Sequence, residues 1–162
     1  MHIREKVYIE TSVIGAYFDD REDIGSAFQH PWTHRCWNEL LAEYDSVISQ
    51  AVLDELGNPD YPNSKKAIDL VSNLQKVPIE EEVKRIVRIY IANKLMPSDT
   101  VGDALHLALA SFHKCDYLLT WNCSHIANPN KFKQIRLLNS EIGLYVPILV
   151  TPNQLLGGSD EK

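Results

Sequence analysis

Three carboxylates and one amide lie at comparable points along the chain, each behind a short apolar segment or in the first turns of a helix. Glu10 closes the segment KVYIE, Glu55 follows DSVIS, Asp103 opens an apolar helical segment, and Asn122 follows DYLLTW. The strands of a parallel sheet end at one common edge, so these side chains can converge on a single cleft. Carboxylates about 4 Å apart repel by roughly 4 kcal/mol at an effective dielectric constant of about 20. Such a cluster therefore takes up protons or binds a divalent cation.

The chemistry of these four side chains selects among cations. All their potential ligand atoms are oxygens, with no imidazole or thiolate in the set, which is typical of Mg²⁺ or Mn²⁺ sites. A hard cation held by a few carboxylates keeps open water positions, so it can activate water and stabilise the charge of a phosphodiester under attack. The set therefore predicts a metal-dependent nuclease.

Most of these side chains also have an ordinary structural explanation when each is taken alone. Thr11 or Ser12 can cap the helix that follows them. Asp103 lies three residues after Thr100, a spacing typical of a capping box, and an acid in a first turn is stabilised by the helix dipole. Glu55 can be a plain exposed acid on a short helix. The convergence of the set is what these separate explanations leave out.

Glu10 is harder to explain structurally, because a carboxylate at the end of a buried strand loses its hydration. It needs a cation or several hydrogen-bond donors as compensation. Thr120 stands at the end of another expected strand, so it joins the candidates at the same edge of the sheet.

The pattern of apolar residues places these side chains on alternating strands and helices. Strands are expected at 6–10, 45–49, 116–121 and 146–151, with a brief extended piece at 77–79. Helices are expected at 12–18, 31–44, 50–56, 63–76, 80–95, 101–114 and 131–142, with a polar loop at 19–30 before Pro31 in a first helical turn. This order predicts an α/β protein with a parallel sheet and helices on both faces. We expect one domain over residues 1–152 and a short polar tail over 153–162.

The composition excludes several classes of protein. With 162 residues, 44% hydrophobic and 23% charged, the chain is typical of a globular domain. No apolar run approaches the roughly 20 residues that span a bilayer, and the start lacks the features of a secretory signal, so a cytoplasmic protein is expected. The net charge of −6 argues against nonspecific coating of nucleic acid, so any RNA contact needs local basic clusters.

The cysteines give little sign of a structural role. The sequence contains Cys36, Cys115 and Cys123, an odd number without C-x-x-C spacing, which suits a reducing compartment. Cys123 with His125, or His30 with His34, could bind a metal ion, but neither pair has a partner pair of familiar zinc-site spacing.

Four segments, VYIETSVIG, ISQAVLDEL, DALHLALAS and YLLTWNCSHIAN, together resemble a PIN-domain ribonuclease, with the closest similarity to VapC-like toxins of type II toxin–antitoxin pairs. The resemblance spans about residues 7–151. It implies a three-layer α/β/α fold and a Mg²⁺-dependent (or Mn²⁺-dependent) endoribonuclease site built from Glu10, Glu55, Asp103 and Asn122. Two positions depart from the family, which normally has Asp at position 10 and commonly has Asp at position 122.

The resemblance also implies supporting residues and partners. Thr11 or Ser12 would help to position the site, and His125 and Asn128 could contact the substrate phosphate. An RNA substrate, a small antitoxin protein and a homodimer are the partners it implies. Candidate basic clusters for RNA are Lys65 with Lys66, Lys84 with Arg85 and Arg88, and Lys131 with Lys133 and Arg136.

Two other functions compete with this one. A PIN-like module that has lost catalysis could use the same cleft to bind RNA or protein, and Asn122 favours that alternative because it lacks a charge. A phosphatase that phosphorylates a strand-end aspartate is disfavoured, because the first strand has no Asp-x-Asp motif.

Overall fold

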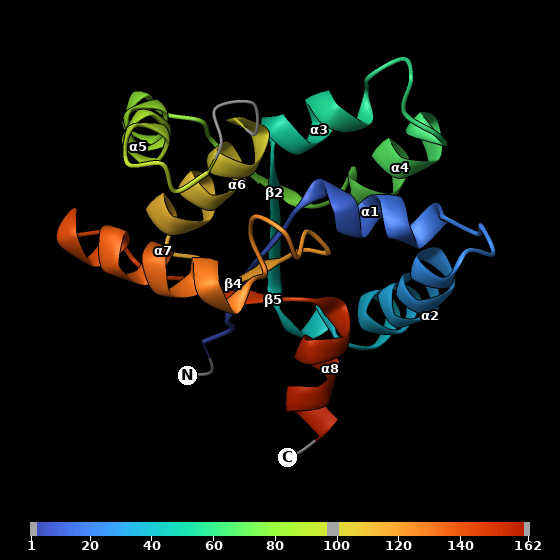
Figure 1. The fold of residues 1–162 in the computed structure, drawn as a ribbon. Coiled ribbons are helices and arrows are strands. Elements are labelled where there is room, and N and C mark those ends of the chain that lie inside the picture. The colour runs from blue at the N-terminus through green and yellow to red at the C-terminus, as the bar shows by residue number, and fades with distance from the viewer. Residues whose placement is uncertain (1–2, 97–100, 161–162) are drawn as a thin grey trace.

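The chain forms a five-stranded parallel sheet with helices on both faces, as seen in a computed structural model that describes residues 3–96 and 101–160 (Figure 1). The strand order is β3-β2-β1-β4-β5. The strands are β1 Lys6–Ile9, β2 Asp45–Ser49, β3 Gln75–Val77, β4 Tyr117–Leu119 and β5 Ile148–Val150. The helices are α1 Thr11–Phe18, α2 Ile24–Glu39, the 3₁₀ turn η1 Leu41–Glu43, α3 Gln50–Leu56, α4 Ser64–Val71, α5 Glu81–Ala92, α6 Val101–Phe112, α7 Pro129–Glu141 and α8 Pro152–Asp160.

The central strand β1 explains why its sequence is apolar without alternation. It pairs in parallel with β2 on one side and with β4 on the other. Val7, Tyr8 and Ile9 have no exposed surface, because both faces of the sheet are covered. The expected α/β fold with a central parallel sheet is therefore confirmed.

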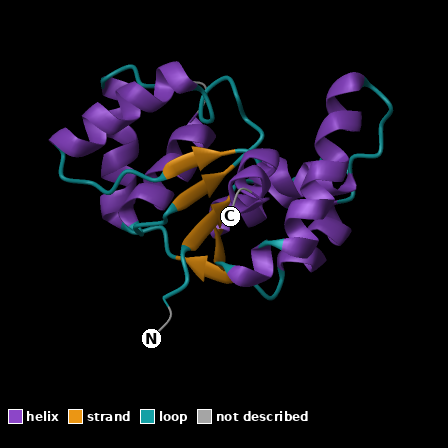
Figure 2. Ribbon diagram, turned by 90° about the horizontal axis from the view of Figure 1, so that it is seen from below, coloured by secondary structure: helices purple, strands orange, loops and turns teal. Residues whose placement is uncertain are grey.

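The helices form the outer two layers (Figures 1 and 2). Helices α1, α2, α4 and α8 cover one face of the sheet, and α5, α6 and α7 cover the other. The chain runs from β1 outward to β2 and β3, and then crosses back to β4 and β5. The order of the strands therefore reverses between β1 and β4, which we call the switch point. In open parallel sheets, ligands bind at such a point, beyond the carboxyl ends of the strands.

Helix α2 begins at Ile24, whereas the sequence predicted a loop up to residue 30 and a helix from Pro31. The reason is an earlier cap, since the Asp23 side chain accepts a hydrogen bond from the Ser26 backbone N–H at 3.1 Å. Pro31 lies inside the helix on an exposed face, where a carbonyl without an N–H partner can turn to solvent.

Two further boundaries differ from the expectation. Helix α4 ends at Val71, and residues 75–77 form the edge strand β3, which pairs with β2, so the extended segment begins two residues earlier than expected. The expected polar tail instead contains α8, which packs against α2 and buries Leu155 and Leu156. These two leucines give the end of the chain an apolar face.

The proposed capping residue Thr100 lies outside the described residues, so the capping box with Asp103 stays a prediction. Within residues 3–96 and 101–160, no helix combines the length and apolar character needed to cross a membrane.

Candidate active site

Glu10 sits at the switch point, directly after β1, and serves as the N-cap of α1. Its side chain is 5% exposed and is held by three donors. The Ser12 backbone N–H donates to Oε2 at 3.0 Å, and the hydroxyls of Ser12 and Thr120 each donate to Oε1 at 2.5 Å. Hydrogen bonds thus compensate for the burial of this carboxylate. The expected cap at Thr11 or Ser12 is wrong by one position, because Glu10 itself is the cap.

The same hydroxyls fix the turn that follows β4. The Trp121 backbone N–H donates to Ser12 Oγ at 2.9 Å, and the Asn122 backbone N–H donates to Thr120 Oγ1 at 2.9 Å. Thr120, a candidate because it stands at the end of a strand, has no exposed surface. Its role in the structure is to join Glu10 to the turn that carries Asn122.

Asp103, in the first turn of α6, faces Asn122 across the switch point. Burial and the negative charge of Glu10 raise the pKa of Asp103, while a hydrogen bond from Asn122 and the nearby His125 and His106 oppose that rise. Asn122 Oδ1 also accepts a hydrogen bond from the His125 backbone N–H at 3.1 Å. Asn122 therefore links Asp103 to the loop 122–128.

Glu55 lies on α3, and two side chains form hydrogen bonds to its carboxylate. The Thr11 hydroxyl donates to Glu55 Oε1 at 3.2 Å, and His106 Nε2 forms a hydrogen bond to the same oxygen. His106 is buried, with only 1% of its surface exposed, whereas the Glu55 side chain is 45% exposed. The carboxylate thus reaches solvent from a buried support.

His106 connects Glu55 to the sheet. Its Nδ1 lies 2.7 Å from the hydroxyl of Tyr8 on β1, which lies 2.8 Å from Ser49 Oγ at the end of β2. Burial disfavours the charged imidazole, but the hydrogen bond to Glu55 and the charges of Glu10, Glu55 and Asp103 outweigh it and raise the pKa of His106. The sequence-based prediction did not include His106 or Tyr8. One signal was present, since Asp103 and His106 are three residues apart and so share a face of one helix.

Two hollows open beside these residues. One, of about 440 Å³, is lined by Ser12, Gly15, Ala16, Phe18, Asp19, Asp20, Arg21, Gln29, Tyr61, Pro62 and Asn63. The other, of about 360 Å³, is lined by Thr11, Glu55, Asn58, Asp60, Tyr61 and Pro62. Tyr61 borders both, and burial together with the charges of Glu10 and Glu55 raises its pKa. A substrate at the acids would have room on either side of this tyrosine.

The approach of Tyr61 depends on Gly15. A Cβ atom at position 15 would lie 2.6 Å from the Tyr61 hydroxyl, closer than atoms can pack without movement. The missing side chain at Gly15 thus lets the segment before α4 lie against α1.

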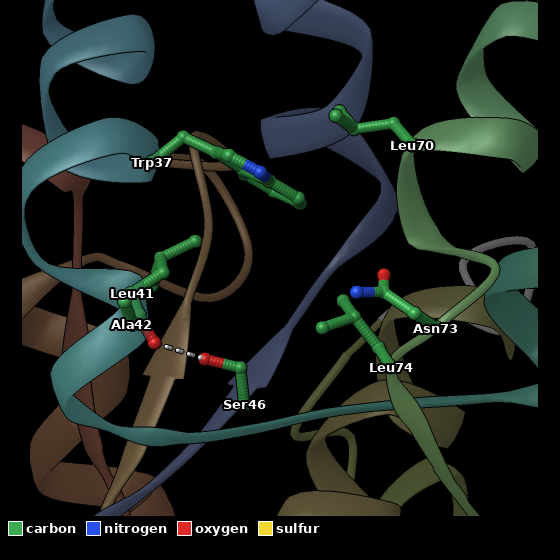
Figure 3. Close-up of a pocket in the computed structure, with 7 residues that line it drawn as sticks. All are labelled: Trp37, Leu41, Ala42, Ser46, Leu70, Asn73 and Leu74. Carbon is green, nitrogen blue, oxygen red and sulfur yellow. Dashed lines mark hydrogen bonds between the residues drawn. The ribbon is translucent and has the colours of Figure 1, made fainter.

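A further hollow lies away from the acids (Figure 3). It has about 270 Å³ and is lined by Trp37, Leu41, Ala42, Ser46, Leu70, Asn73 and Leu74, from α2, η1, β2, α4 and the segment after α4. Ser46 lies near the start of β2, whereas the acids lie beyond the ends of the strands. None of the candidate residues lines this hollow.

The remaining candidates have structural partners. Asn128 caps α7 by accepting a hydrogen bond from the Asn130 backbone N–H at 3.0 Å. His30 and His34 contact the main-chain oxygens of Ala16 and Tyr17, at the end of α1. Their ring nitrogens join α2 to α1, which leaves no support for a metal site at this histidine pair.

The basic clusters are partly engaged on their own helix. On α5, Lys84 pairs with Glu81 and Arg85 pairs with Glu82. On α7, the Lys131 ammonium donates to the Leu95 carbonyl at 2.7 Å, while Lys133 and Arg136 are exposed. Lys65 and Lys66, on α4, are likewise exposed.

The acids approach one another without forming a compact ligand cage. Within residues 3–96 and 101–160, no three His, Cys, Asp or Glu side chains lie close enough together to hold a metal ion by themselves. Asp103 and Glu10 interact electrostatically, Asn122 bridges to Asp103, and Glu55 joins the group through Thr11 and His106. All four predicted residues thus lie around the switch point.

Six chains from solved structures match this chain. A crystal structure of VapBC2 from Rickettsia felis, bound to a DNA fragment from their promoter, matches this chain with a TM-score of 0.49 and 16% sequence identity. The match covers 90% of this chain and 98% of that chain. No protein-family profile and no curated protein sequence matches the chain.

Proposed function

We propose that this chain is a metal-dependent endoribonuclease of the PIN-domain type, with Glu10, Glu55, Asp103 and Asn122 as its active-site residues. The observation that carries the proposal is the state of Asp103. Burial and the charge of Glu10 raise its pKa, at the edge of the sheet where parallel α/β folds bind ligands. A carboxylate whose ionised form is disfavoured by burial and by a neighbouring negative charge is typical of a functional site rather than of a solvated helix end.

The donor set fits a hard divalent cation. Asp103, Asn122 and Glu55 offer only oxygen ligands, which suit Mg²⁺ or Mn²⁺. Mg²⁺ usually keeps several waters and needs only one or two protein carboxylates, so a closed cage is not required. The chemistry that such a cation supplies when bound is activation of water and neutralisation of phosphate charge.

The chain's own residues prepare this site. Thr120 and Ser12 hold Glu10, whose second oxygen Oε2 accepts one backbone N–H and keeps capacity for a further contact. Asn122 orients Asp103 through its amide, and Thr11 and His106 orient Glu55. These contacts hold the acids before a substrate arrives, which reduces the reorganisation that the reaction needs.

The substrate and partners follow from the sequence resemblance. RNA is the proposed substrate, with His125 on the loop 122–128 and the exposed Lys133 and Arg136 on α7 as candidate contacts for its phosphates. A VapC-like toxin would be held inactive by a small antitoxin and would pair with a second copy of itself. A cytoplasmic location is part of the same proposal.

Cleavage of a mixed RNA pool by the purified protein tests the function, in Mg²⁺, Mn²⁺ or EDTA. Asp103→Asn should reduce metal-dependent cutting by at least about 100-fold, because it removes the charge of a proposed ligand. Asp69→Asn, an exposed acid on α4, is the matched control and should cut like the native chain. Native protein that cuts equally well in EDTA, or an Asp103→Asn variant that cuts normally, would refute the proposal.

A stability measurement separates loss of activity from loss of fold. Because its folded pKa is raised, Asp103 favours the neutral form, and the stability this gives below the unfolded pKa is lost as pH rises through the folded pKa. At neutral pH and without metal, Asp103→Asn should therefore melt at a higher temperature than the native chain. A lower melting temperature would mean that the ionised carboxylate supports the fold.

A second candidate is a binding module without catalysis. Its support is that Glu10 is already satisfied by three donors, so no cation is needed to explain its burial. Calorimetry decides between the two. Absence of heat from Mg²⁺ or Mn²⁺ binding, together with retained RNA binding, would favour the module.

A further inference from the structure

His106 belongs to a buried row of hydrogen-bonded groups that runs from the sheet to Glu55. Ala51 N–H donates to Ser49 Oγ at 3.2 Å, Ser49 lies 2.8 Å from the Tyr8 hydroxyl, and Tyr8 lies 2.7 Å from His106 Nδ1. The other ring nitrogen, Nε2, contacts Glu55 Oε1. Ser49, Tyr8 and His106 are essentially without exposed surface, so water cannot replace these partners.

For a neutral imidazole, one arrangement of the protons uses every donor in the row. Ser49 donates its hydroxyl proton to Tyr8, Tyr8 donates to Nδ1, and Nε2–H then donates to the Glu55 carboxylate. A neutral ring with its proton on Nδ1 would set a lone pair of Nε2 against Glu55. The contact with the carboxylate therefore requires a hydrogen on Nε2, and the row behind the ring fixes it there.

The donors to Glu55 act on one oxygen. Thr11 Oγ1 and His106 Nε2 both contact Oε1. Among the described residues, neither donor touches Oε2. Both contacts thus hold the carboxylate through one of its two oxygens, while 45% of the Glu55 side chain is exposed.

We propose that His106 is a positioning residue, which fixes Glu55 through Oε1 and presents Oε2 to a divalent cation. The inference rests on the proposed function, since Glu55 is a ligand only if the site binds metal. It adds a role for a buried histidine, and for the Tyr8 and Ser49 hydroxyls behind it, that the four proposed active-site residues do not include.

Two substitutions of similar size separate this role from simple packing. In His106→Gln, the amide can reach the position of Nε2 and keep a donor on Glu55. In His106→Asn, the shorter side chain places its amide near Nδ1, where it meets Tyr8 but not Glu55. We expect Mn²⁺ affinity, measured by calorimetry, to fall about tenfold or more in His106→Asn and clearly less in His106→Gln.

A double-substitution cycle shows whether the effect passes through Glu55. In a Glu55→Gln background, His106→Asn should cause no further loss of Mn²⁺ affinity, because the carboxylate it positions is gone. His113→Gln is the matched control, since this histidine lies just beyond α6 and contacts the Pro78 carbonyl. It should bind Mn²⁺ like the native chain. Thermal unfolding of each variant confirms that it is folded.

Nitrogen NMR of the histidine ring gives a readout independent of metal and activity. We expect a proton on Nε2 of His106 and an altered Nε2 signal in Glu55→Gln. Equal Mn²⁺ affinity in His106→Asn and His106→Gln, or a proton on Nδ1 alone, would overturn the inference. If the native chain neither binds Mn²⁺ nor cuts RNA, the proposed function fails, whereas the NMR result still decides whether His106 fixes Glu55.

Discussion

Two buried tyrosines, Tyr8 and Tyr90, each anchor a polar network, and the two networks end differently. Tyr90 donates to Asn139 Oδ1 at 2.6 Å, and the Asn139 amide donates to Ser111 Oγ at 2.9 Å and to the Tyr145 carbonyl at 3.0 Å. Every side chain in this network is neutral, and each is essentially buried. The network therefore closes on itself and on the main chain, and it joins α5, α6 and α7.

The Tyr8 network has the same kind of interior but an open end. Its last member, Glu55, is a carboxylate with nearly half of its side chain exposed. A structural network gains nothing from a charge at its rim, since exposed charges are stable in water without help. Similar buried hydrogen bonds thus join three helices around Tyr90 and support a partly exposed carboxylate beside Tyr8.

The largest expected effect comes from removing the negative charge of Glu55, at the exposed end of the Tyr8 network. Glu55→Gln keeps the shape of the side chain but removes the carboxylate, so we expect RNA cleavage to fall by about 100-fold. Its unfolding free energy should change little, because the site is half-exposed. Asp54→Asn, a neighbouring exposed acid on α3, serves as the control in the cleavage assay. Unchanged cleavage by Glu55→Gln would make the open end as structural as the closed one.

The closed network should respond in the opposite way. Asn139→Ala removes the amide donor of the Tyr145 carbonyl and leaves the Tyr90 hydroxyl with a longer contact to Ser111 Oγ at 3.3 Å, which costs roughly 1–3 kcal/mol of unfolding free energy. Urea unfolding measures this loss. RNA cleavage at a temperature where the variant remains folded should equal that of the native chain. A selective loss of cleavage would contradict the assignment of this network to stability alone.

The two networks can also be compared through the pH dependence of stability, because both tyrosine hydroxyls have raised pKa values. Burial raises the pKa of Tyr90 to about 12, against the opposing hydrogen bonds, and burial also raises the pKa of Tyr8 well above 10. The stability that each neutral phenol contributes is complete below pH 10 and is lost as pH rises through the folded pKa. Tyr90→Phe and Tyr8→Phe should each lower the free energy of unfolding by about 1 kcal/mol at pH 8. Between pH 10 and 12, the free energy of unfolding of each variant should fall less steeply with pH than that of the native chain.

Mn²⁺ affinity then distinguishes these two Phe variants. Only Tyr8→Phe should weaken Mn²⁺ binding, because only Tyr8 supports the imidazole behind Glu55. Equal Mn²⁺ affinity in both variants would show that the network behind His106 has no influence on the site.

Much of the fold could be predicted from the sequence where apolar runs are bounded by clear signals. The strand before Glu10 and the strand before Gln50 lie within one residue of their expected bounds. The start of α2 was missed because Asp23 caps the helix upstream of Pro31, and a proline is usually taken as a first-turn residue. The edge strand Gln75–Val77 has only three residues, too few for periodicity to separate it from the end of a helix.

The candidate site also has parts that could be predicted from the sequence and parts that could not. The grouping of the acids could be predicted because each follows a strand or begins a helix, positions that the topology of a parallel sheet brings together. The link between Tyr8 and His106 could not, because it depends on how α6 packs across the end of the sheet. The capping role of Glu10 was missed since side chains of Ser and Thr are the commoner caps.

The absence of a side chain at Gly15 has a consequence for the shape of both hollows beside the acids. A single methyl group at position 15 would force the Tyr61 hydroxyl to move, and Tyr61 lines both hollows beside the acids. The side chain at this one position on α1 therefore affects the shape of both hollows. Exchange of glycine for alanine would reshape both entrances without touching any acid.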